Sequence, residues 1–296
     1  MVSQILDAHH HLWDLSEMRH TWLAEKNVIR FFGDPEPIQK NYHVPDFLAD
    51  IGNLPVKASV HIQCGVALED SVLETEFIQA QSNAHGLANA IIAFCDLTQE
   101  DAQAQLDAHQ MFPNVRGMRQ IVGRDAAEDA RNGTNALLES PKFKDGLKML
   151  RARNLSFDLQ LTPPLLPAAA KLFKSIEDVP VAICHAGSPQ DFTKDGMRDW
   201  QAGLKDFAEH RNMICKISGF GMFDHDWTDD SIREKVLRVI DIFTPARVAF
   251  GSNFPVDKLT ASYADTMGAF LKITQDFSSC ERDDMFYNVA KDFYRI

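Results

Sequence analysis

The feature that most constrains the fold is an eightfold alternation between short apolar segments and longer amphipathic ones. Each short segment has five to seven residues, is rich in Val, Ile and Phe, and ends near Gly, Pro, Asp or Ser, which is typical of a buried strand. Between these segments apolar residues recur at three- and four-residue spacing, as from Ile232 to Phe243, which predicts helices. The predicted strands span residues 5–11, 58–64, 90–96, 115–121, 155–161, 181–185, 213–218 and 248–252.

Near-continuous apolar strands that alternate with helices indicate a parallel sheet covered by helices. Eight such units fit a closed (β/α)8 TIM barrel, an α/β fold; a doubly wound open sheet is the alternative. With 296 residues, the chain has room for two domains of roughly 150 residues or for one barrel of about 250. No linker or low-complexity segment divides the chain, so we predict a single barrel domain over residues 1–296.

The connection after the first strand, residues 13–57, is unusually long and carries several aromatic and proline residues. We expect one short helix in it, near Val44–Ile51. Long loops that follow barrel strands lie over the active-site end. This connection is therefore a candidate lid or pocket wall.

The composition narrows the class of function. The chain is 45% apolar and 24% charged, as in ordinary globular proteins, and its 30 basic and 42 acidic residues give a net charge of −12. Without a basic run, this charge argues against nucleic acid as a partner, although a small anionic substrate is compatible with it. The five cysteines are scattered without CxxC spacing, and there is neither a signal-peptide pattern nor an apolar run of membrane-spanning length. We expect a cytoplasmic protein; the sequence does not indicate its oligomeric state.

Polar residues gather where the predicted strands end, which is where barrel enzymes place their chemistry. The first strand ends Asp7-Ala8-His9-His10-His11, and strict alternation places Asp7, His9 and His11 on one face and His10 on the other. Two imidazoles at this spacing can reach one metal ion or one substrate group.

Later strands add further candidates. Arg119 follows the fourth strand, and a buried arginine needs either an acid such as Asp96 or Asp158 or an anionic ligand. His185 ends the sixth strand and is followed by small residues, whereas the neighbouring Cys184 points away and is expected to pack. Three more polar residues sit on the second, seventh and eighth strands: Gln63, Lys216 and Asn253.

Taken in order, these segments resemble the amidohydrolase superfamily, in particular the lactonase-like "amidohydrolase 2" branch that includes sugar-acid lactonases and pyrone dicarboxylate lactonase. The resemblance covers nearly the whole chain. It rests on Asp7-Ala8-His9-His10-His11-Leu12-Trp13, Thr21-Trp22-Leu23, the Gln63 strand, Gly117-Met118-Arg119, Phe157-Asp158-Leu159-Gln160, Cys184-His185-Ala186-Gly187, Lys216-Ile217-Ser218-Gly219, Phe250-Gly251-Ser252-Asn253-Phe254-Pro255, and Asn288-Val289-Ala290 with Phe293-Tyr294.

The resemblance implies a (β/α)8 barrel and a lactone-opening hydrolase. His9 and His11 match the HxH motif of the family's first strand, His185 matches its sixth-strand histidine, and Arg119 matches an arginine that meets substrate oxygens. Enzymes of this branch need either no metal or one loosely held divalent ion. Here His9, His11 and His185 form a sufficient set for one ion, with zinc expected, and a water in the fourth position.

The chain departs from the family pattern at Asn253, where the last strand usually ends in an aspartate that activates water. An amide cannot accept a proton at neutral pH, although it can orient water or a carbonyl. The fifth strand also lacks a terminal histidine and carries Asp158 and Gln160 instead, so a binuclear zinc centre would lack ligands.

The leading hypothesis is hydrolysis of a small carboxylated or sugar-derived lactone. His9 and His11, or a metal they hold, would stabilise the oxyanion, and His185 would move the proton, with Asp257 as a second candidate base. The expected substrate-binding residues are Arg119, Gln63 and Lys216, with Trp13 and Trp22 as apolar walls. Two alternatives remain: a metal-dependent non-oxidative decarboxylase of the same superfamily, and a pseudoenzyme or binding barrel that lost its base at Asn253.

Overall fold

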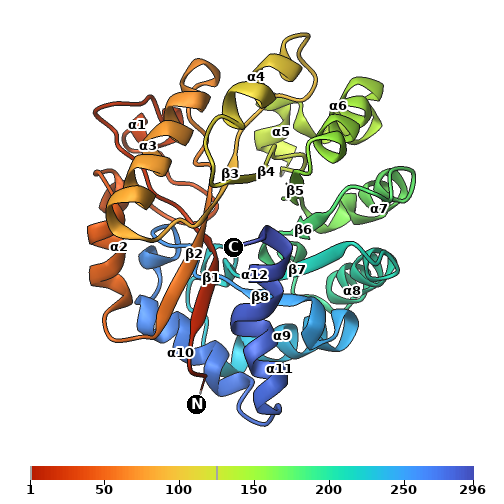
Figure 1. The fold of residues 1–296 in the computed structure, drawn as a ribbon. Helices are drawn as coiled ribbons and strands as arrows, with labels where there is room; N and C mark the ends of the chain where they lie inside the picture. Colours follow the sequence, from red (N-terminus) through yellow and green to blue (C-terminus); the bar gives the residue numbers. More distant parts are fainter. Residues whose placement is uncertain (1, 125) are drawn as a thin grey trace.

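The computed structural model describes residues 2–124 and 126–296 and forms an eight-stranded parallel barrel (Figure 1). Hydrogen bonds near the strand ends join the last strand to the first. The amide of Asn253 donates to the carbonyl of His9, and that of His11 to Phe254, both at 2.7 Å. The predicted TIM barrel is confirmed, and the open sheet is excluded. The strands are β1 (Ile5–His10), β2 (Val56–Ile62), β3 (Ala90–Ala93), β4 (Val115–Met118), β5 (Ser156–Leu159), β6 (Val181–Ile183), β7 (Met213–Ile217) and β8 (Val248–Phe250).

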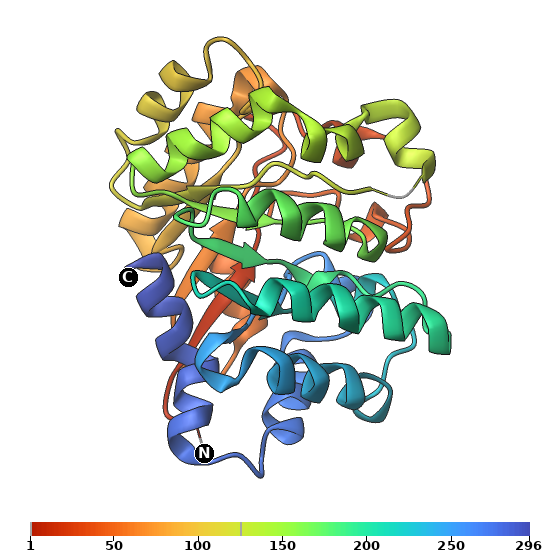
Figure 2. The same ribbon diagram turned by 90° about the vertical axis from the view of Figure 1, so that its right-hand side faces the viewer.

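Helices surround the strands on the outside, and both chain termini lie at one end of the barrel (Figure 2). Side-chain caps fix several helix starts; the hydroxyl of Thr228, for example, accepts from the amide of Ser231 at 3.2 Å. Within the described ranges, no helix combines the length and apolarity needed to cross a membrane. The helices are α1 (Thr21–Ala24), α2 (Val44–Ile51), α3 (Ser71–His85), α4 (Ala102–His109), α5 (Ala126–Asn132), α6 (Pro141–Ala152), α7 (Leu166–Lys174), α8 (Lys194–Ala208), α9 (Asp229–Phe243), α10 (Tyr263–Ile273), α11 (Ser279–Asp283) and α12 (Val289–Tyr294).

Strand β1 contains one extra residue, which corrects the predicted alternation. Asp7 pairs with Ser59 of β2 and His10 pairs with His61, so three steps on β1 match two on β2. Asp7 therefore faces outward, where one carboxylate oxygen accepts from the hydroxyl of Tyr263 on α10 at 3.0 Å. The prediction that Asp7 shares a face with His9 and His11 was wrong, because the bulge reverses the alternation between Asp7 and His9. His10 does face outward, as predicted.

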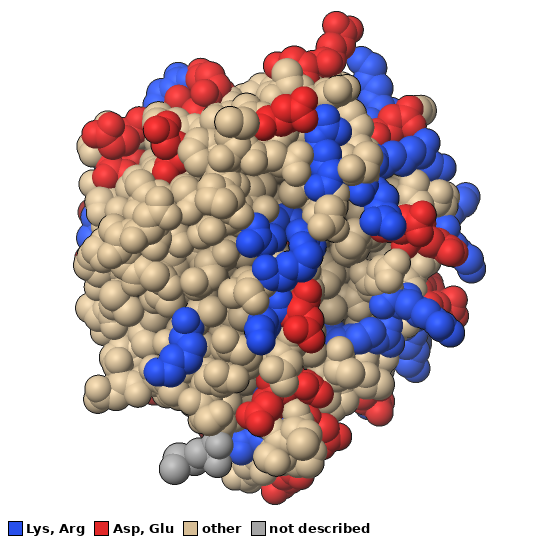
Figure 3. Space-filling model, viewed as in Figure 1, with Lys and Arg blue, Asp and Glu red and all other residues tan. Residues whose placement is uncertain are grey.

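Helix α12 covers the end of the barrel where the strands begin (Figure 1). Its Tyr294 is fully buried, and the Tyr294 hydroxyl donates to Asp158 of β5 at 3.0 Å. Asp158 also forms a buried ion pair with Lys216 of β7. The outer surface of this end mixes basic and acidic side chains, with no large area of one sign (Figure 3). The barrel interior is thus sealed at this end by a polar group of three side chains.

The long first connection carries α1 and α2, and the expected helix at Val44–Ile51 is present. Trp13 forms an isolated antiparallel bridge with Tyr42, which ties the start of the connection to the segment just before α2. The middle of the connection turns back over the barrel mouth, where Phe31 and Phe32 line a cavity. This segment therefore forms part of the wall of that cavity.

Candidate active site

A cavity of about 380 Å³ opens at the carboxyl ends of the strands. Five polar side chains from five different strand ends line it: His11, Arg119, Gln160, His185 and Asn253. Their convergence follows from the parallel topology, which brings every strand's carboxyl end to the same rim. The cavity is therefore the candidate active site.

His9 lies beside this group, fully buried. Its ring centroid is 4.4 Å from that of His185 and 5.1 Å from that of His11, and neither of its ring nitrogens has a hydrogen-bond partner among the described residues. Burial, with help from the positive charge of Lys216, lowers the pKa of His9 well below its usual value. His9 is therefore a neutral imidazole with unused polar atoms at neutral pH.

His185 sits on a left-handed turn that follows β6. His185, Ala186, Gly187 and Ser188 have φ values of 53°, 53°, 70° and 54°. Such a run is costly for residues with a Cβ atom, so its presence at a cavity marks stored strain. The indole nitrogen of Trp200 stabilises the turn by donating to the carbonyl of Ala186 at 2.7 Å.

The ring of His185 is oriented by its neighbours. Nδ1 lies 3.0 Å from the hydroxyl of Ser218, while Nε2 is left for the cavity. Burial and the charges of Arg119 and Lys216 lower the pKa of His185 well below its usual range, so the ring is neutral at neutral pH. A neutral imidazole of fixed orientation can accept a proton from water and return it.

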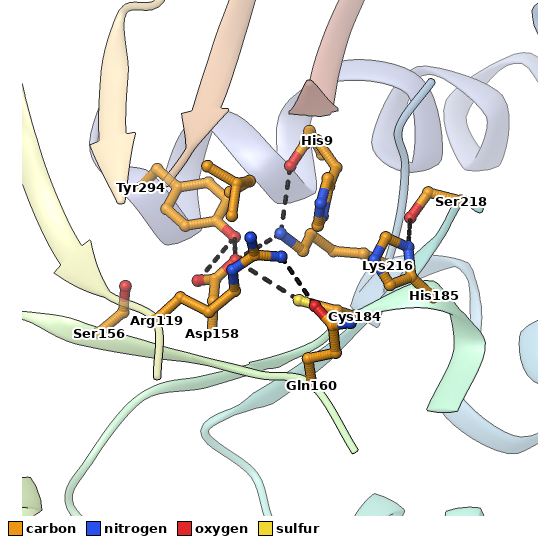
Figure 4. Close-up of polar contacts among 12 residues, drawn as sticks. His9, Arg119, Ser156, Asp158, Gln160, Cys184, His185, Lys216, Ser218 and Tyr294 are labelled. Carbon is orange, nitrogen blue, oxygen red and sulfur yellow. Dashed lines mark hydrogen bonds and ion pairs between the residues drawn. The ribbon is translucent and has the colours of Figure 1, made fainter. Parts of the chain in front are cut away.

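Arg119 is a buried cation without a carboxylate partner among the residues that the structure describes. Its guanidinium donates to the Gln160 side chain at 2.8 Å and to the carbonyl of Gln63, and its Nε has no partner (Figure 4). Neither acid considered from the sequence forms an ion pair with it. Asp158 is paired with Lys216, and Asp96 accepts from Thr98, Gln99 and Gln120. Arg119 thus retains the capacity to bind an anion in the cavity.

Asn253 connects His11 to Asp257. The Asn253 backbone has a φ of 58°, a left-handed conformation that asparagine tolerates better than most residues. Its side-chain oxygen lies 3.2 Å from Nε2 of His11, and its side-chain nitrogen donates to Asp257 at 2.7 Å. Burial raises the pKa of Asp257 to about 7 and lowers that of His11 to about 3.

The hydrogen-bonding chemistry of this trio allows two states. Nδ1 of His11 donates to the carbonyl of Ile62 at 2.7 Å, so a neutral His11 has only a lone pair at Nε2. That lone pair can only accept a hydrogen bond, so the N–H group of the Asn253 amide must face His11. The amide oxygen then faces Asp257, and the Asp257 carboxyl must be protonated in order to donate to it. With Asp257 ionised, the amide nitrogen faces Asp257 and the amide oxygen faces His11, an arrangement that needs a proton on Nε2 of His11 as well. The amide orientation therefore reports the protonation state of Asp257.

Five of the predicted site residues do not line the cavity, and one of them is His9, described above. Trp13 is fully buried and its indole nitrogen donates to the carbonyl of Lys40 at 2.7 Å, so it packs the first connection and is not a substrate wall. Lys216 is fully buried and neutralised by Asp158, so it does not reach an anionic substrate. Gln63 and Asp257 lie behind Arg119 and Asn253, which they position. Trp22 does line the cavity, as expected.

The structure adds contributors that the sequence did not single out as site residues. Gln160 fixes the Arg119 guanidinium, and Ser218 fixes His185. Both stand at strand ends two residues beyond a buried charged residue, Asp158 and Lys216, and this spacing on one face was the available signal. Phe32 and Met222 also line the cavity, but no local pattern marks them.

A second group, His61, Cys64 and Glu74, offers ligand-type atoms within 4.8 Å of one another. The amide of Leu12 donates to Nδ1 of His61 at 3.2 Å, so a neutral His61 carries its proton on Nε2. Nε2 faces Glu74 at 3.9 Å and cannot bind a cation through a lone pair in this tautomer. Glu74 also accepts from the amide of Cys64 at 2.7 Å. This group is therefore a buried polar connection between β2 and α3.

His9, His11 and His185 carry the donor atoms that a divalent ion needs, although only the ligand atoms of His61, Cys64 and Glu74 form a compact group among the described residues. The orphaned nitrogens of His9 and the cavity-facing Nε2 of His185 are neutral imidazole donors, the form that a metal requires. His11 completes the set only by releasing Asn253, because its other nitrogen is held by Ile62. Neutral imidazole nitrogens are ligands that a single zinc ion would accept, and those of His9 and His185 are the most available.

The chain belongs to the amidohydrolase family, whose Amidohydro_2 model matches residues 6–296. It is 36% identical to the uncharacterized protein y4mH of Sinorhizobium fredii over 99% of this chain and 98% of that protein. It is 26% identical to an L-fucono-1,5-lactonase of Burkholderia ambifaria, over 98% and 95% of the two chains. A Burkholderia multivorans amidohydrolase crystallised with bound zinc shares the fold at a TM-score of 0.83 and 22% identity, over 99% of each chain.

Proposed function

We propose that this amidohydrolase opens a small lactone that carries a carboxylate. The observation that carries the proposal is Arg119, a buried cation at the cavity with no carboxylate partner among the described residues. A substrate carboxylate would supply the missing partner in a site where water competes poorly. The 26% identity to an L-fucono-1,5-lactonase supports lactone chemistry.

His185 would perform the proton transfers. Its Nε2 faces the cavity and its ring is neutral, so it can take a proton from water as the oxygen attacks the ring carbonyl. The carbonyl carbon then gains one C–O bond, and the ring C–O bond breaks. The proton held on His185 passes to the departing alkoxide, which leaves a hydroxy acid. Ser218 keeps the ring in place throughout, through its contact with Nδ1.

His9, His11 and Asn253 would surround the carbonyl oxygen. In the state with protonated Asp257, the amide nitrogen of Asn253 donates toward His11 and is close to the cavity. A divalent ion held by His9, His11 and His185 would supply Lewis-acid polarisation of the carbonyl. The same histidines serve the proposed reaction by orienting water and substrate in a buried site.

A pseudoenzyme is the second candidate, and Asn253 is the observation that favours it. The amide replaces the aspartate that family members use to activate water. Against this, Asp257 lies 2.7 Å behind Asn253, and the strained turn under His185 is retained. A barrel that only binds ligands has no need of that strain.

A lactone panel assayed with a pH indicator tests the proposal, with release of carbon dioxide from unsaturated acids measured in parallel. We expect ring opening of carboxylated lactones, lost by at least 100-fold in His185→Ala and slowed through a higher KM in Arg119→Met. Met111→Ala, at an exposed position in the loop before β4, is the control for effects of expression and purification. Hydrolysis of no lactone by the parent, with His185→Ala behaving identically, would rule the proposal out.

A further inference from the structure

The inference concerns the substrate class and rests on the proposed lactone hydrolysis. We propose that the substrate carries an apolar group, alkyl or aryl, on the side opposite its carboxylate. This group would pack against a wall of five side chains that line the cavity, which we call the apolar wall: Trp22, Phe32, Met222, Phe223 and Val256.

The apolar wall is a hydrophobic cluster distinct from the main core. Phe32, Met222 and Val256 form its centre, and Trp22 and Phe223 pack against them. The three central side chains keep 9%, 6% and 8% of their surface exposed, and all three line the cavity. A cluster that is nearly buried yet borders a cavity gains further burial only from something that enters that cavity.

The wall is braced by ring contacts. Trp22 meets Phe32 edge-on with centroids 5.8 Å apart, and Phe31 stacks on Phe223 at 6.0 Å with 13° between the planes. Phe31 belongs to the first connection, whereas Phe223 follows β7. The contact between Phe31 and Phe223 joins two loops that are distant in sequence, so the wall is preformed, as expected of a specificity pocket.

Most polar atoms next to the wall are already engaged within the protein; the exception among the described residues is Nε of Arg30, which is itself buried. The indole nitrogen of Trp22 donates to the carbonyl of Cys64 at 2.6 Å. Arg30 pairs with Glu25 at 2.7 Å and also donates to the carbonyl of Trp22 at 3.2 Å. A substrate hydroxyl turned toward the wall would lose its water without gaining a partner from these groups.

Arg119, the anion-binding residue of the proposed reaction, stands across the cavity from the centre of the wall. Arg119 follows β4, whereas Met222 and Val256 follow β7 and β8 and Phe32 lies in the connection after β1. In a closed barrel of eight strands in sequential order, β4 is diametrically opposite β8. A bound molecule therefore spans from a cationic side to an apolar side, with its reactive carbonyl between them at His11 and His185. This pattern favours an apolar-substituted lactone acid over a polyhydroxylated sugar lactone.

Two matched lactones test the inference: γ-butyrolactones with the same carboxylate, one bearing a phenyl group and the other a 1,2-dihydroxyethyl group. We expect the parent to favour the phenyl compound by about tenfold or more in kcat/KM, a typical discrimination by an apolar pocket. Phe32→Ala and Met222→Ala should reduce this ratio severalfold, Phe32→Leu should retain most of it, and Met111→Ala should leave it unchanged. A preference for the dihydroxy compound, or a ratio unaltered in Phe32→Ala, overturns the inference.

Binding of unreactive anions separates this inference from the proposed reaction. By calorimetry, 3-phenylpropanoate should bind the parent at least tenfold more tightly than gluconate, and Phe32→Ala should lose that difference. This result supports an apolar substituent on the bound molecule even if no lactone is opened. In that case only the proposed hydrolysis is overturned. Equal binding of the two anions, together with lactone hydrolysis, overturns the apolar substituent and keeps the reaction. Thermal unfolding of each variant verifies that it is folded.

Discussion

The carboxyl group of Asp257 lies 2.7 Å from the side-chain nitrogen of Asn253, on the side of that amide away from the cavity. The resemblance described from the sequence implies a water-activating carboxylate at the position of Asn253. Here a carboxyl group is present one side chain further back, fully screened from solvent. In this pair the amide faces the cavity and the carboxyl group stands behind it. Substitutions at these two residues therefore distinguish an active enzyme from a pseudoenzyme.

Asn253→Asp should lower activity at neutral pH by about tenfold or more. The change puts two carboxyl groups in contact, and like charges at this distance cannot both ionise, so one proton stays trapped between them. Steady-state kinetics from pH 5 to pH 9 is the measurement. If an inactive parent gained activity through this substitution, the chain would be a pseudoenzyme that lost its base.

Asp257→Asn should make stability less sensitive to pH. Burial raises the pKa of Asp257 from 3.8 to about 7 in the folded state, so the folded protein binds this proton more tightly than the unfolded chain does. The contribution of Asp257 to stability is thus fully present below pH 3.8 and declines as pH rises toward 7, by on the order of 1 kcal/mol per pH unit. Urea unfolding of parent and variant between pH 5 and pH 8 measures the difference. Parallel curves would show that Asp257 titrates normally.

Gly219→Ala should abolish most activity. A Cβ atom at Gly219 would lie 2.5 Å from Nδ1 of His185, and the φ of 70° at Gly219 is itself unfavourable for alanine. We expect at least a 100-fold loss in kcat and a destabilisation of about 1–3 kcal/mol. Gly268→Ala is the matched control, because a Cβ there meets nothing within 4 Å and the site is in helix α10, where alanine is favoured. Equal effects of the two substitutions would remove the link to His185.

Lys216→Met should destabilise the fold by about 3–5 kcal/mol, because it leaves Asp158 buried without its cation. The double variant Lys216→Met with Asp158→Leu should recover much of that loss, since no unpaired charge remains. A double-mutant cycle by chemical denaturation gives the coupling. Additive losses would mean that the ion pair contributes little beyond its packing.

Zinc added to tag-free protein should bind at no more than one ion per chain. Binding should be lost in His9→Ala and in His185→Ala, and retained in His61→Ala, because only the first two histidines offer nitrogens with available lone pairs. Elemental analysis after dialysis gives the stoichiometry, and chelator treatment gives the metal-free reference. Loss of zinc in His61→Ala would reassign the site to the group with Cys64 and Glu74.

Much of the architecture was predictable from local pattern. Apolar runs with turn residues at fixed intervals predict eight strands, and strand order then brings His11, Arg119 and His185 to one rim. The bulge that turns Asp7 outward was not predictable, because register depends on pairing with Ser59 and His61 across the sheet. The ion pair between Lys216 and Asp158 was not predictable for a similar reason. The two residues are 58 positions apart in the sequence, and only the closed barrel brings them together.

The left-handed turn at His185 shows a different limit. The small residues after His185 indicated that a ligand could approach closely. The four successive positive φ values, however, depend on a tertiary contact, the hydrogen bond from Trp200 of helix α8. Propensity alone favours other conformations for Ala186 and Ser188. The position of the candidate base thus depends on packing that no short window of sequence contains.

The contact of Tyr294 with Asp158 spans 136 residues of the chain. As the polypeptide leaves the ribosome, Asp158 and Lys216 are made long before the tyrosine that joins their polar group and the helix that covers it. The barrel interior therefore stays open to water at the end where the strands begin until helix α12 has been made. A chain cut before Tyr294 would leave the Asp158–Lys216 ion pair without the hydroxyl and the helix that cover it.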